Sequence, residues 1–313
     1  MRSKKRARNH DKLMSTHCGL PWSLSTQNTC GGVGIGQWAY ETNPGFFAQD
    51  NTTATGIPAI PPSFGLLDSA PDRWTNFFAR IESLNHRSDR HTFYKVFLLG
   101  RHGEGFHNVA EAKYGTAAWD DYWSKLNGDG EITWGPDAEL TSKGKDQALA
   151  ATAAWRTELA AGIPLPGRFY TSPLTRSLDT CKITFERILA ERHRHVKPVV
   201  VENCREEIGV HTCDKRRTKT YIKTTFSEFI VERGFSEDDL LWDPDIRETK
   251  AHVAERAKDV FDMIFKNDEE IFISITGHGG IINGFLATVG RPTYGLPTGG
   301  ILPIVVKAVY TPS

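Results

Sequence analysis

Short apolar runs alternate with helical patterns from Tyr94 onward, and this alternation constrains the fold more than any other feature. Strands that are separated by helices pair in parallel, because each crossover returns the chain to the same end of the sheet. The pattern therefore predicts an α/β fold, a three-layer α/β/α sandwich around a mostly parallel central sheet. The expected strands are Tyr94–Leu99, Phe169–Thr171, Val199–Glu202, Ile271–Thr276 and Pro303–Val309.

Apolar residues at helical spacing predict the helices of this sandwich. A first group lies before the alternating region, in a lead-in that is expected to pack on the core, and three more lie between the strands. The four apolar faces are Trp74, Phe77, Phe78, Ile81 and Leu84; Ala148, Thr152, Trp155 and Leu159; Leu174, Leu178, Cys181, Phe185 and Ile188; and Val253, Ala257, Val260, Phe261 and Ile264.

The front of the chain has no sustained period of either kind. We therefore expect residues 1–45 to be a flexible extension and residues 46–313 to form the folded domain. The extension begins with a basic cluster, which is either a nuclear address or plain solvated chain. The cluster consists of Arg2, Lys4, Lys5, Arg6 and Arg8.

The overall charge excludes two classes of partner. The chain has 38 Lys and Arg residues against 38 Asp and Glu residues, so no global field attracts nucleic acid or an anionic membrane. No apolar run approaches the length of a membrane span, and residues 1–28 lack the apolar core of a secretory signal. A cytoplasmic location is therefore expected, with a nuclear one as the alternative; a homo-oligomer stays open.

The cysteines suggest no cofactor. The five residues Cys18, Cys30, Cys181, Cys204 and Cys213 are odd in number and irregularly spaced, which fits neither a disulfide framework nor a zinc pattern. We therefore expect no metal, and the alternative is a site formed by Cys204, Cys213 and His211.

Arg101-His102-Gly103 follows the first apolar run directly. Open α/β sheets bind ligands at the carboxyl ends of their strands, so this triplet is expected at the ligand-binding edge. A guanidinium beside an imidazole, followed by a glycine that lets backbone approach closely, suits a phosphoryl group. The alternative is a hydrogen-bonded histidine with a structural role.

Four further segments follow in a set order, each where an expected strand ends or a helix begins. They are Leu140–Ala148, Tyr170–Thr180, Cys204–Gly209 and Ile273–Gly280. Together with Gly100–Asn108 they resemble the histidine phosphatase superfamily, or phosphoglycerate mutase-like family, over about residues 94–310. The long first motif and the segment Gly209–Asp214 are most similar to its fungal members.

The resemblance implies a role for each matching residue. His102 is the expected nucleophile, which forms a phosphohistidine, and His278 is expected to donate a hydrogen bond to the developing charge. Arg101 and Arg176 are expected to bind the phosphate oxygens. Asn108 and Gly279 complete the expected phosphate-binding set.

A carboxylic acid is expected to protonate the leaving alcohol. Glu206 matches the family's acid, and its neighbour Glu207 is the rival, because the distance to Gly209 is one residue shorter than in many members. Gly279 stands where the acid-phosphatase branch carries an Asp, so that branch is not expected. Gly105 stands where mutase members usually carry a Ser, which weakens a mutase assignment.

The resemblance thus implies a metal-independent phosphatase that hydrolyses phosphate esters of small molecules. The alternatives are a phosphoglycerate-type phosphomutase and a non-catalytic phosphate-binding regulatory protein. Two segments are candidates for substrate contacts, each with ordinary packing or solvation as its alternative. A basic segment would form a second anion site (His211, Lys215, Arg216, Arg217, Lys219 and Lys223), and an insertion would form an aromatic wall (Trp119, Tyr122, Trp123 and Trp134).

Overall fold

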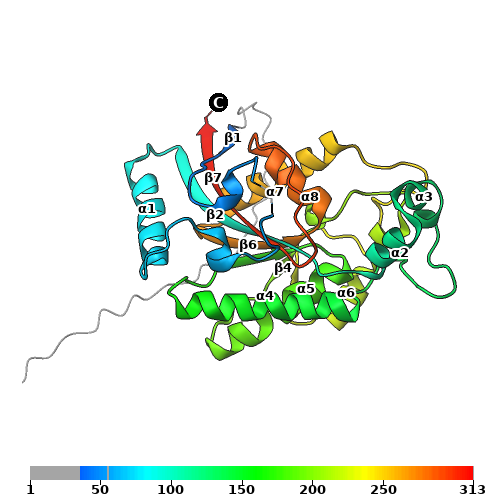
Figure 1. The fold of residues 1–313 in the computed structure, drawn as a ribbon. Coiled ribbons are helices and arrows are strands. Elements are labelled where there is room, and N and C mark those ends of the chain that lie inside the picture. Colours follow the sequence, from blue (N-terminus) through cyan, green and yellow to red (C-terminus); the bar gives the residue numbers. More distant parts are fainter. Residues whose placement is uncertain (1–35, 55, 313) are drawn as a thin grey trace, which may run out of the picture.

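A single seven-stranded sheet forms the centre of the protein. The computed structural model describes residues 36–54 and 56–312, and in these residues the strand order is β1-β7-β2-β6-β3-β4-β5 (Figure 1). The strands are β1 Gln37–Thr42, β2 Thr92–Arg101, β3 Arg168–Thr171, β4 Val199–Val200, β5 Ile230–Val231, β6 Phe272–Gly277 and β7 Ile301–Thr311.

Most of the strand pairs are parallel, as predicted. The strands β2, β6, β3, β4 and β5 pair in parallel, whereas β7 lies antiparallel between β1 and β2. The register places Arg101 of β2 opposite Gly277 of β6, and Thr171 of β3 opposite Thr276. Three motif-bearing strands therefore end side by side at the same edge of the sheet.

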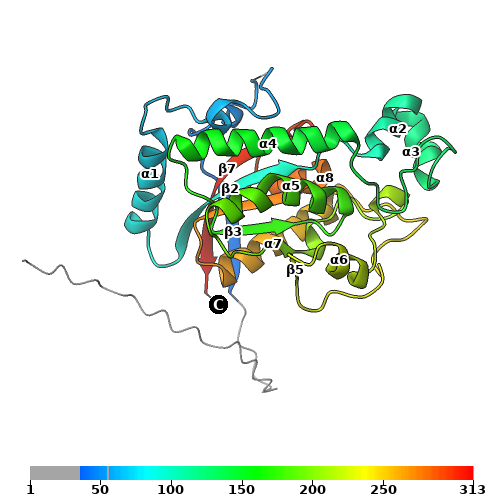
Figure 2. The ribbon, with the colours of Figure 1, turned by 90° about the horizontal axis from the view of Figure 1, so that it is seen from below.

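Helices cover both faces of the sheet, which gives the predicted three layers. The helices α1, α4 and α5 pack on one face and α7 and α8 on the other (Figures 1 and 2). The helices are α1 Arg73–Arg87, α2 Phe106–Tyr114, α3 Thr116–Asp121, α4 Ser142–Ala160, α5 Thr175–Glu191, α6 Lys219–Thr225, α7 Lys250–Asn267 and α8 Gly279–Thr288. Within the described residues, none of them is long and apolar enough to cross a bilayer.

Two apolar clusters anchor these layers. One gathers Trp74, Trp155 and Phe185 beneath α1, α4 and α5, and the other gathers Phe261 and Phe285 beneath α7 and α8. All five of these rings are at least 96 % buried, so they hold the helices in place by removing large apolar surfaces from water. The predicted apolar faces are thus the faces that pack on the sheet.

A third, smaller cluster supports α2 and α3. Trp119 and Trp134 lie there with their ring centroids 5.5 Å apart, packed with Ala110, Ala138 and Cys213. These helices stand at one end of the molecule, beyond the carboxyl ends of β2 and β6 (Figure 1). The insertion after the first motif is therefore a packed part of the fold that lies beside the ligand-binding edge of the sheet.

The predicted flexible extension reaches too far along the chain. Gln37–Thr42 form β1, which pairs antiparallel with β7 at the end of the chain. Trp38 packs on Phe265 with centroids 5.8 Å apart, and the Tyr40 hydroxyl donates to Asp262 at 2.6 Å. The alternation is only six residues long, so distant partners decide the strand. The basic cluster, Cys18 and Cys30 lie outside the described residues.

Candidate active site

His102 lies directly after β2 and is 1 % exposed. Its Nδ1 hydrogen bonds to the Gly103 carbonyl at 2.6 Å. Because a carbonyl only accepts, the proton is on Nδ1 and the lone pair is on Nε2. Burial, followed by the charges of Arg176 and Arg101, holds the pKa of His102 well below its ordinary value. The lowered pKa favours the neutral ring, with the lone pair of Nε2 available.

Gly103 allows the backbone after His102 to pass very close to helix α4. A side chain here has no space, because a Cβ atom on Gly103 would lie 2.2 Å from the carbonyl oxygen of Gly144. The Gly103 N–H donates to the Thr180 hydroxyl of α5 at 3.0 Å. The triplet thus fixes the histidine between two helices.

His278 follows β6, and its ring centroid lies 4.9 Å from that of His102. The Ser172 hydroxyl accepts a hydrogen bond from the Leu174 N–H, and it lies 2.7 Å from Nε2 of His278. A proton donated by the serine hydroxyl to Nε2 would place the imidazole proton on Nδ1, the tautomer that can donate to a ligand. Burial and the nearby Arg176 lower the pKa of His278 well below its ordinary value.

Arg176 is fully buried at the start of α5. Its Nη1 donates to the Cys213 carbonyl and its Nη2 to Asp214 Oδ1, both at 2.7 Å. Arg101, at the end of β2, donates through Nη1 to the Leu296 carbonyl at 2.8 Å. Arg101 is thus held through one terminal nitrogen and Arg176 through two, and the Nε–H of each has no partner among the described residues.

Four buried side-chain nitrogens around His102 have no partner among the described residues. They are Nε of Arg101, Nε of Arg176, Nδ1 of His107 and Nδ1 of His278. Buried polar groups are almost always paired, and each unpaired one costs about 1–3 kcal/mol. A tetrahedral oxyanion beside His102 would supply acceptors for the Nε–H groups of the two arginines and would neutralise the charge of Arg101, whose described side-chain contact is a backbone carbonyl.

Glu206 reaches the same region from the loop after β4. Gly280 makes room for it, because a Cβ atom there would lie 2.0 Å from Glu206 Oε1. The Gly280 N–H donates to Oε2 at 3.2 Å. Burial, followed by the charges of Asp214 and Glu207, raises the pKa of Glu206, so this carboxyl holds a proton more readily than an ordinary one.

Glu207 has different surroundings from Glu206. One of its oxygens forms an ion pair with Lys250, and the other lies 3.8 Å from Nε of Arg247. Glu207 is therefore paired with two basic side chains at the edge of the cavity. Of the two neighbours, Glu206 is the one whose environment suits a proton donor.

A cavity of about 510 Å³ opens beside these groups. Arg101, Asn108 and Glu206 line it together with Arg247 and Lys250. The Asn108 Oδ1 accepts from the Gly105 N–H at 3.0 Å, which caps α2. Asn108 therefore caps a helix and also lines the cavity.

The structure brings the predicted site residues together at one edge of the sheet. Gly279 lies beside Arg101, since a Cβ atom on Gly279 would be 3.8 Å from the Arg101 guanidinium carbon. The Gly279 carbonyl accepts from Asn283 Nδ2 at 2.9 Å, within α8. The predicted set of Arg101, His102, Asn108, Arg176, Glu206, His278 and Gly279 forms one cluster.

The predicted second anion site is not formed as expected. Of the basic segment, only His211 lines the cavity. Arg216 is buried, with its Nε 3.0 Å from both oxygens of Glu202, and Lys219 donates to the Phe235 carbonyl at 3.1 Å. These cations are used for internal pairing. The cavity instead receives Arg247 and Lys250, which sequence analysis missed.

The predicted aromatic wall is also smaller than expected. Trp119 lines the cavity, whereas Trp134 is fully buried and Trp123 stacks on Tyr114 with centroids 3.9 Å apart. Tyr122 is 55 % exposed and does not line the cavity. Most of the aromatic rings therefore support α2 and α3 rather than contact a ligand.

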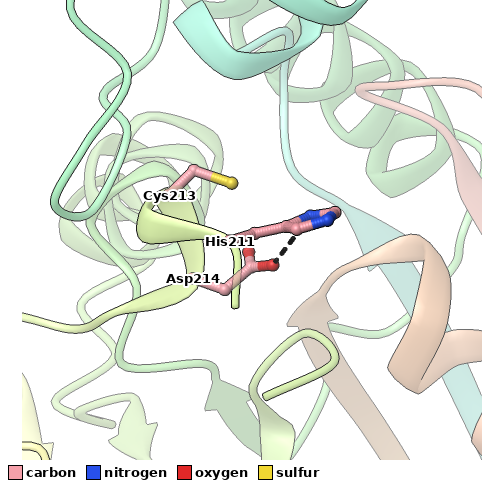
Figure 3. Close-up of side chains that lie close together, drawn as sticks. All are labelled: His211, Cys213 and Asp214. Carbon is pink, nitrogen blue, oxygen red and sulfur yellow. Dashed lines mark ion pairs between the residues drawn. The ribbon is translucent and has the colours of Figure 1, made fainter. Parts of the chain in front are cut away.

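The alternative metal site is not assembled from the residues considered. Cys204 lies in the apolar cluster beneath α7, and Cys213 lies in the one beneath α3. His211 and Cys213 do lie close to Asp214, with ligand atoms within 4.8 Å of one another (Figure 3).

The surroundings of this group do not suit a cation. Burial and the charge of Asp214 raise the pKa of Cys213 well above its ordinary value, which keeps the thiol protonated. Burial alone would raise the pKa of Asp214, but Arg247 and Arg176 hold it below its ordinary value. The carboxylate already binds two guanidinium groups.

Asp214 is a positioning residue that sequence analysis missed. It is 3 % exposed and joins Arg176 at 2.7 Å to Arg247 at 3.0 Å. In the sequence, Asp214 was marked only as the last residue of the segment Gly209–Asp214. That segment is similar to fungal members of the family, but the similarity assigned no role to Asp214. His107 is the other missed residue, and it lines the cavity beside His102.

Comparisons with known proteins agree with this geometry. The family model described as "Histidine phosphatase superfamily (branch 1)" matches residues 97–296. The "Probable phosphoglycerate mutase" of Arthroderma benhamiae is 42 % identical over 289 residues, which cover 86 % of this chain and 84 % of that protein. The "Probable phosphoglycerate mutase PMU1" of Saccharomyces cerevisiae is 35 % identical, covering 74 % of this chain and 88 % of that protein.

A solved structure is also similar to this chain. It is a mycobacterial glucosyl-3-phosphoglycerate phosphatase in complex with VO3, which is 19 % identical with a TM-score of 0.41. The similarity covers 67 % of this chain and 92 % of that one.

Proposed function

The chain belongs to the histidine phosphatase superfamily, and from this premise we propose that it is a metal-independent phosphatase. Its substrates are phosphate esters of small molecules, and its reaction proceeds through a phosphohistidine at His102. The observation that carries the proposal is the set of unpartnered buried donors around the neutral ring of His102.

In the first step, the lone pair on Nε2 of His102 attacks phosphorus. The N–P bond forms while the P–O bond to the leaving alcohol breaks, and Glu206 transfers its carboxyl proton to the leaving oxygen. The Nδ1–H of His102 remains hydrogen-bonded to the Gly103 carbonyl, and this hydrogen bond stabilises the positive charge that develops on the ring.

In the second step, water attacks the phosphorus of the phosphohistidine. The ionised Glu206 accepts a proton from this water, and the N–P bond breaks to return the lone pair to Nε2. Inorganic phosphate leaves, and both His102 and Glu206 are restored to their starting protonation states. The open cavity of about 510 Å³ beside Glu206 gives water access for this step.

Charge neutralisation in this mechanism comes from the protein alone. The transferring phosphoryl group spreads its charge over three oxygens, and phosphoryl-transfer catalysis consists mainly of positioning and electrostatic stabilisation. Arg101, Arg176 and His278 offer their unpartnered N–H groups to these oxygens. The reaction as written needs no metal ion.

A phosphoglycerate-type mutase is the second candidate, because the fungal relatives carry that name. A mutase must protect its phosphohistidine from water and return the phosphoryl group to a second hydroxyl. The rim of this cavity is open to solvent, because the side chain of Lys250 there is 80 % exposed. Water access of this kind favours hydrolysis of the phosphohistidine instead. A non-catalytic phosphate-binding protein would not need a carboxyl group with a raised pKa, such as that of Glu206, in the same cavity.

The deciding experiment offers p-nitrophenyl phosphate, then a panel of small-molecule phosphate esters, and follows the release of inorganic phosphate. A parallel assay follows conversion of 3-phosphoglycerate to 2-phosphoglycerate. Phosphate release with a 32P label trapped on His102 by acid-free quenching supports the phosphatase. Phosphoglycerate interconversion without phosphate release would replace it by the mutase, and no turnover of any ester would leave a binding protein.

A further inference from the structure

His107 has no part in the mechanism above, although it lies next to the nucleophile. It is the second residue of α2, and its ring centroid is 5.4 Å from that of His102. The ring lines the same cavity as Arg101 and Asn108. A third imidazole therefore borders the space that the phosphoryl group would occupy.

Gly105 explains how this ring fits. The backbone at Gly105 has φ −98°, which any residue adopts, so the glycine is not required for its conformation. A Cβ atom there would lie 2.7 Å from Nδ1 and 2.8 Å from Cε1 of His107. The missing side chain at position 105 is therefore what gives the His107 ring its place.

The two nitrogens of His107 have different surroundings. Nδ1 lies against Gly105, is sealed from solvent and has no partner among the described residues. Nε2 is therefore the nitrogen of His107 that can contact a ligand in the cavity. Burial, followed by the charge of Arg176, lowers the pKa of His107 well below its ordinary value. A neutral imidazole carries one proton, and only on Nε2 can that proton meet an acceptor supplied by a ligand.

We propose that His107 binds the phosphoryl group of the substrate, with its Nε2–H donating to a non-bridging oxygen, and that Gly105 sets the position of the ring. The inference rests on the proposed function, because that function places the phosphoryl group beside His102. It adds a contact from α2 to those from β2, α5 and β6. The phosphoryl group is thereby enclosed by four elements of the fold.

Calorimetric titration with inorganic phosphate tests the contact without relying on turnover. His107→Leu removes the donor and should weaken phosphate binding about 10- to 100-fold, the worth of a hydrogen bond to a charged group. His107→Gln keeps an N–H donor at the reach of Nε2 and should restore most of the affinity. Gly105→Ala leaves the histidine in place but pushes its ring aside, and should weaken binding as well.

Lys250→Ala is the matched control, because it removes another basic side chain of the cavity that no proposed step uses. Its phosphate affinity should stay within about threefold of wild type. A His107→Leu protein that binds phosphate as tightly as wild type would overturn the inference. If His107→Leu does not fold, as judged by circular dichroism, unchanged binding by Gly105→Ala would overturn it equally.

Hydrolysis of p-nitrophenyl phosphate separates this inference from the proposed function. If wild type binds phosphate but hydrolyses nothing, the proposed function fails, while the binding comparison still decides the role of His107. If wild type hydrolyses the ester and all His107 variants bind phosphate normally, the function stands and the inference fails.

Discussion

The residues beneath the cavity and those at its rim differ in how completely their polar groups are paired within the protein. What we call the floor consists of Arg101, which lines the cavity, and of the buried neighbours His102, Arg176 and His278; Nε of both arginines and Nδ1 of His278 have no partner among the described residues. On the rim, formed by Glu207, His211, Arg247 and Lys250, the charged groups pair within the protein: Glu207 with Lys250, Arg247 and His211 with Asp214.

This difference separates two functions of the site. Unpaired donors in a buried position are costly, and an anion that pairs with them recovers that cost on binding. The paired rim charges gain little from the same anion and instead fix the loops that shape the entrance. The floor is therefore expected to determine the chemistry, and the rim to determine the architecture around it.

The largest effect is expected from the floor. His102→Ala removes the nucleophile, for which the site offers no substitute, and should lower kcat for p-nitrophenyl phosphate by about 10⁴-fold or more. The rim pairs are untouched, so the thermal unfolding midpoint should stay near that of wild type. Substantial hydrolysis by a folded His102→Ala protein would remove the phosphohistidine from the mechanism.

Glu206 and Glu207 are adjacent residues that both line the cavity but have different partners. Glu206→Gln should slow hydrolysis of an alkyl ester such as glycerol 2-phosphate by about 10²- to 10⁴-fold, because the leaving alkoxide then has no proton donor. The loss with p-nitrophenyl phosphate should be much smaller, since p-nitrophenolate leaves unaided. Glu207→Gln should change both rates less than about threefold. If the leaving-group dependence appears in Glu207→Gln instead, the proton donor is one residue further along.

The pH dependence of hydrolysis should reflect the two groups whose pKa values are shifted, His102 and Glu206. Hydrolysis needs neutral His102, whose pKa is lowered from 6.5, so the rate falls only at pH values well below 6.5. It also needs protonated Glu206, whose pKa is raised from 4.5, so the rate falls as the pH rises above that raised value. For alkyl esters we therefore expect a bell-shaped profile of kcat/KM, with an acid limb below pH 6.5 from His102 and an alkaline limb above pH 4.5 from Glu206. An alkaline limb that survives in Glu206→Gln would assign it to another group.

Rim variants should cost stability more than chemistry. Arg247→Ala deprives the Glu207 and Gly209 carbonyls and Asp214 of a shared donor, and should lower the free energy of unfolding in urea by about 1–3 kcal/mol. Lys250→Ala removes an ion pair of a largely exposed side chain and should change it by less than about 0.5 kcal/mol. A larger loss of kcat in Arg247→Ala than in Glu206→Gln would contradict the division between rim and floor.

The smallest effect is expected from chelation. Arg101, Arg176 and His278 supply the positive charge and the hydrogen bonds, so EDTA should leave kcat and KM for p-nitrophenyl phosphate unchanged. Activity that disappears in EDTA and returns with a divalent ion would show that the floor is incomplete without a metal.

Much of the floor could be predicted from the sequence because each of its motifs is local. Arg101 and His102 follow an apolar run directly, and His278 follows another. Once those runs are strands of a parallel sheet, their carboxyl ends lie together without further information. Arg176 needed the family resemblance, since taken alone it also fits a surface pair with Asp179.

The rim could not be predicted in the same way. Arg247 meets Asp214 across 33 positions of chain, and no local pattern marks either residue as a partner of the other. The basic segment at residues 215–223 looked equally suited to the cavity, but Arg216 pairs with Glu202 and Lys219 donates to a backbone carbonyl. Which of two basic segments faces the cavity depends on how the loops pack.

The sequence by itself determined the α/β class, the mostly parallel sheet and the strand ends that carry Arg101, His102 and His278, because hydrophobic periodicity and strand-end position are local properties. Only the tertiary structure decided that Gln37–Thr42 join the sheet, that Glu206 accepts from the Gly280 N–H while Glu207 pairs with Lys250, and that Gly105 makes room for His107. Burial, pairing and steric space depend on contacts between atoms, and those contacts exist only after the chain has folded.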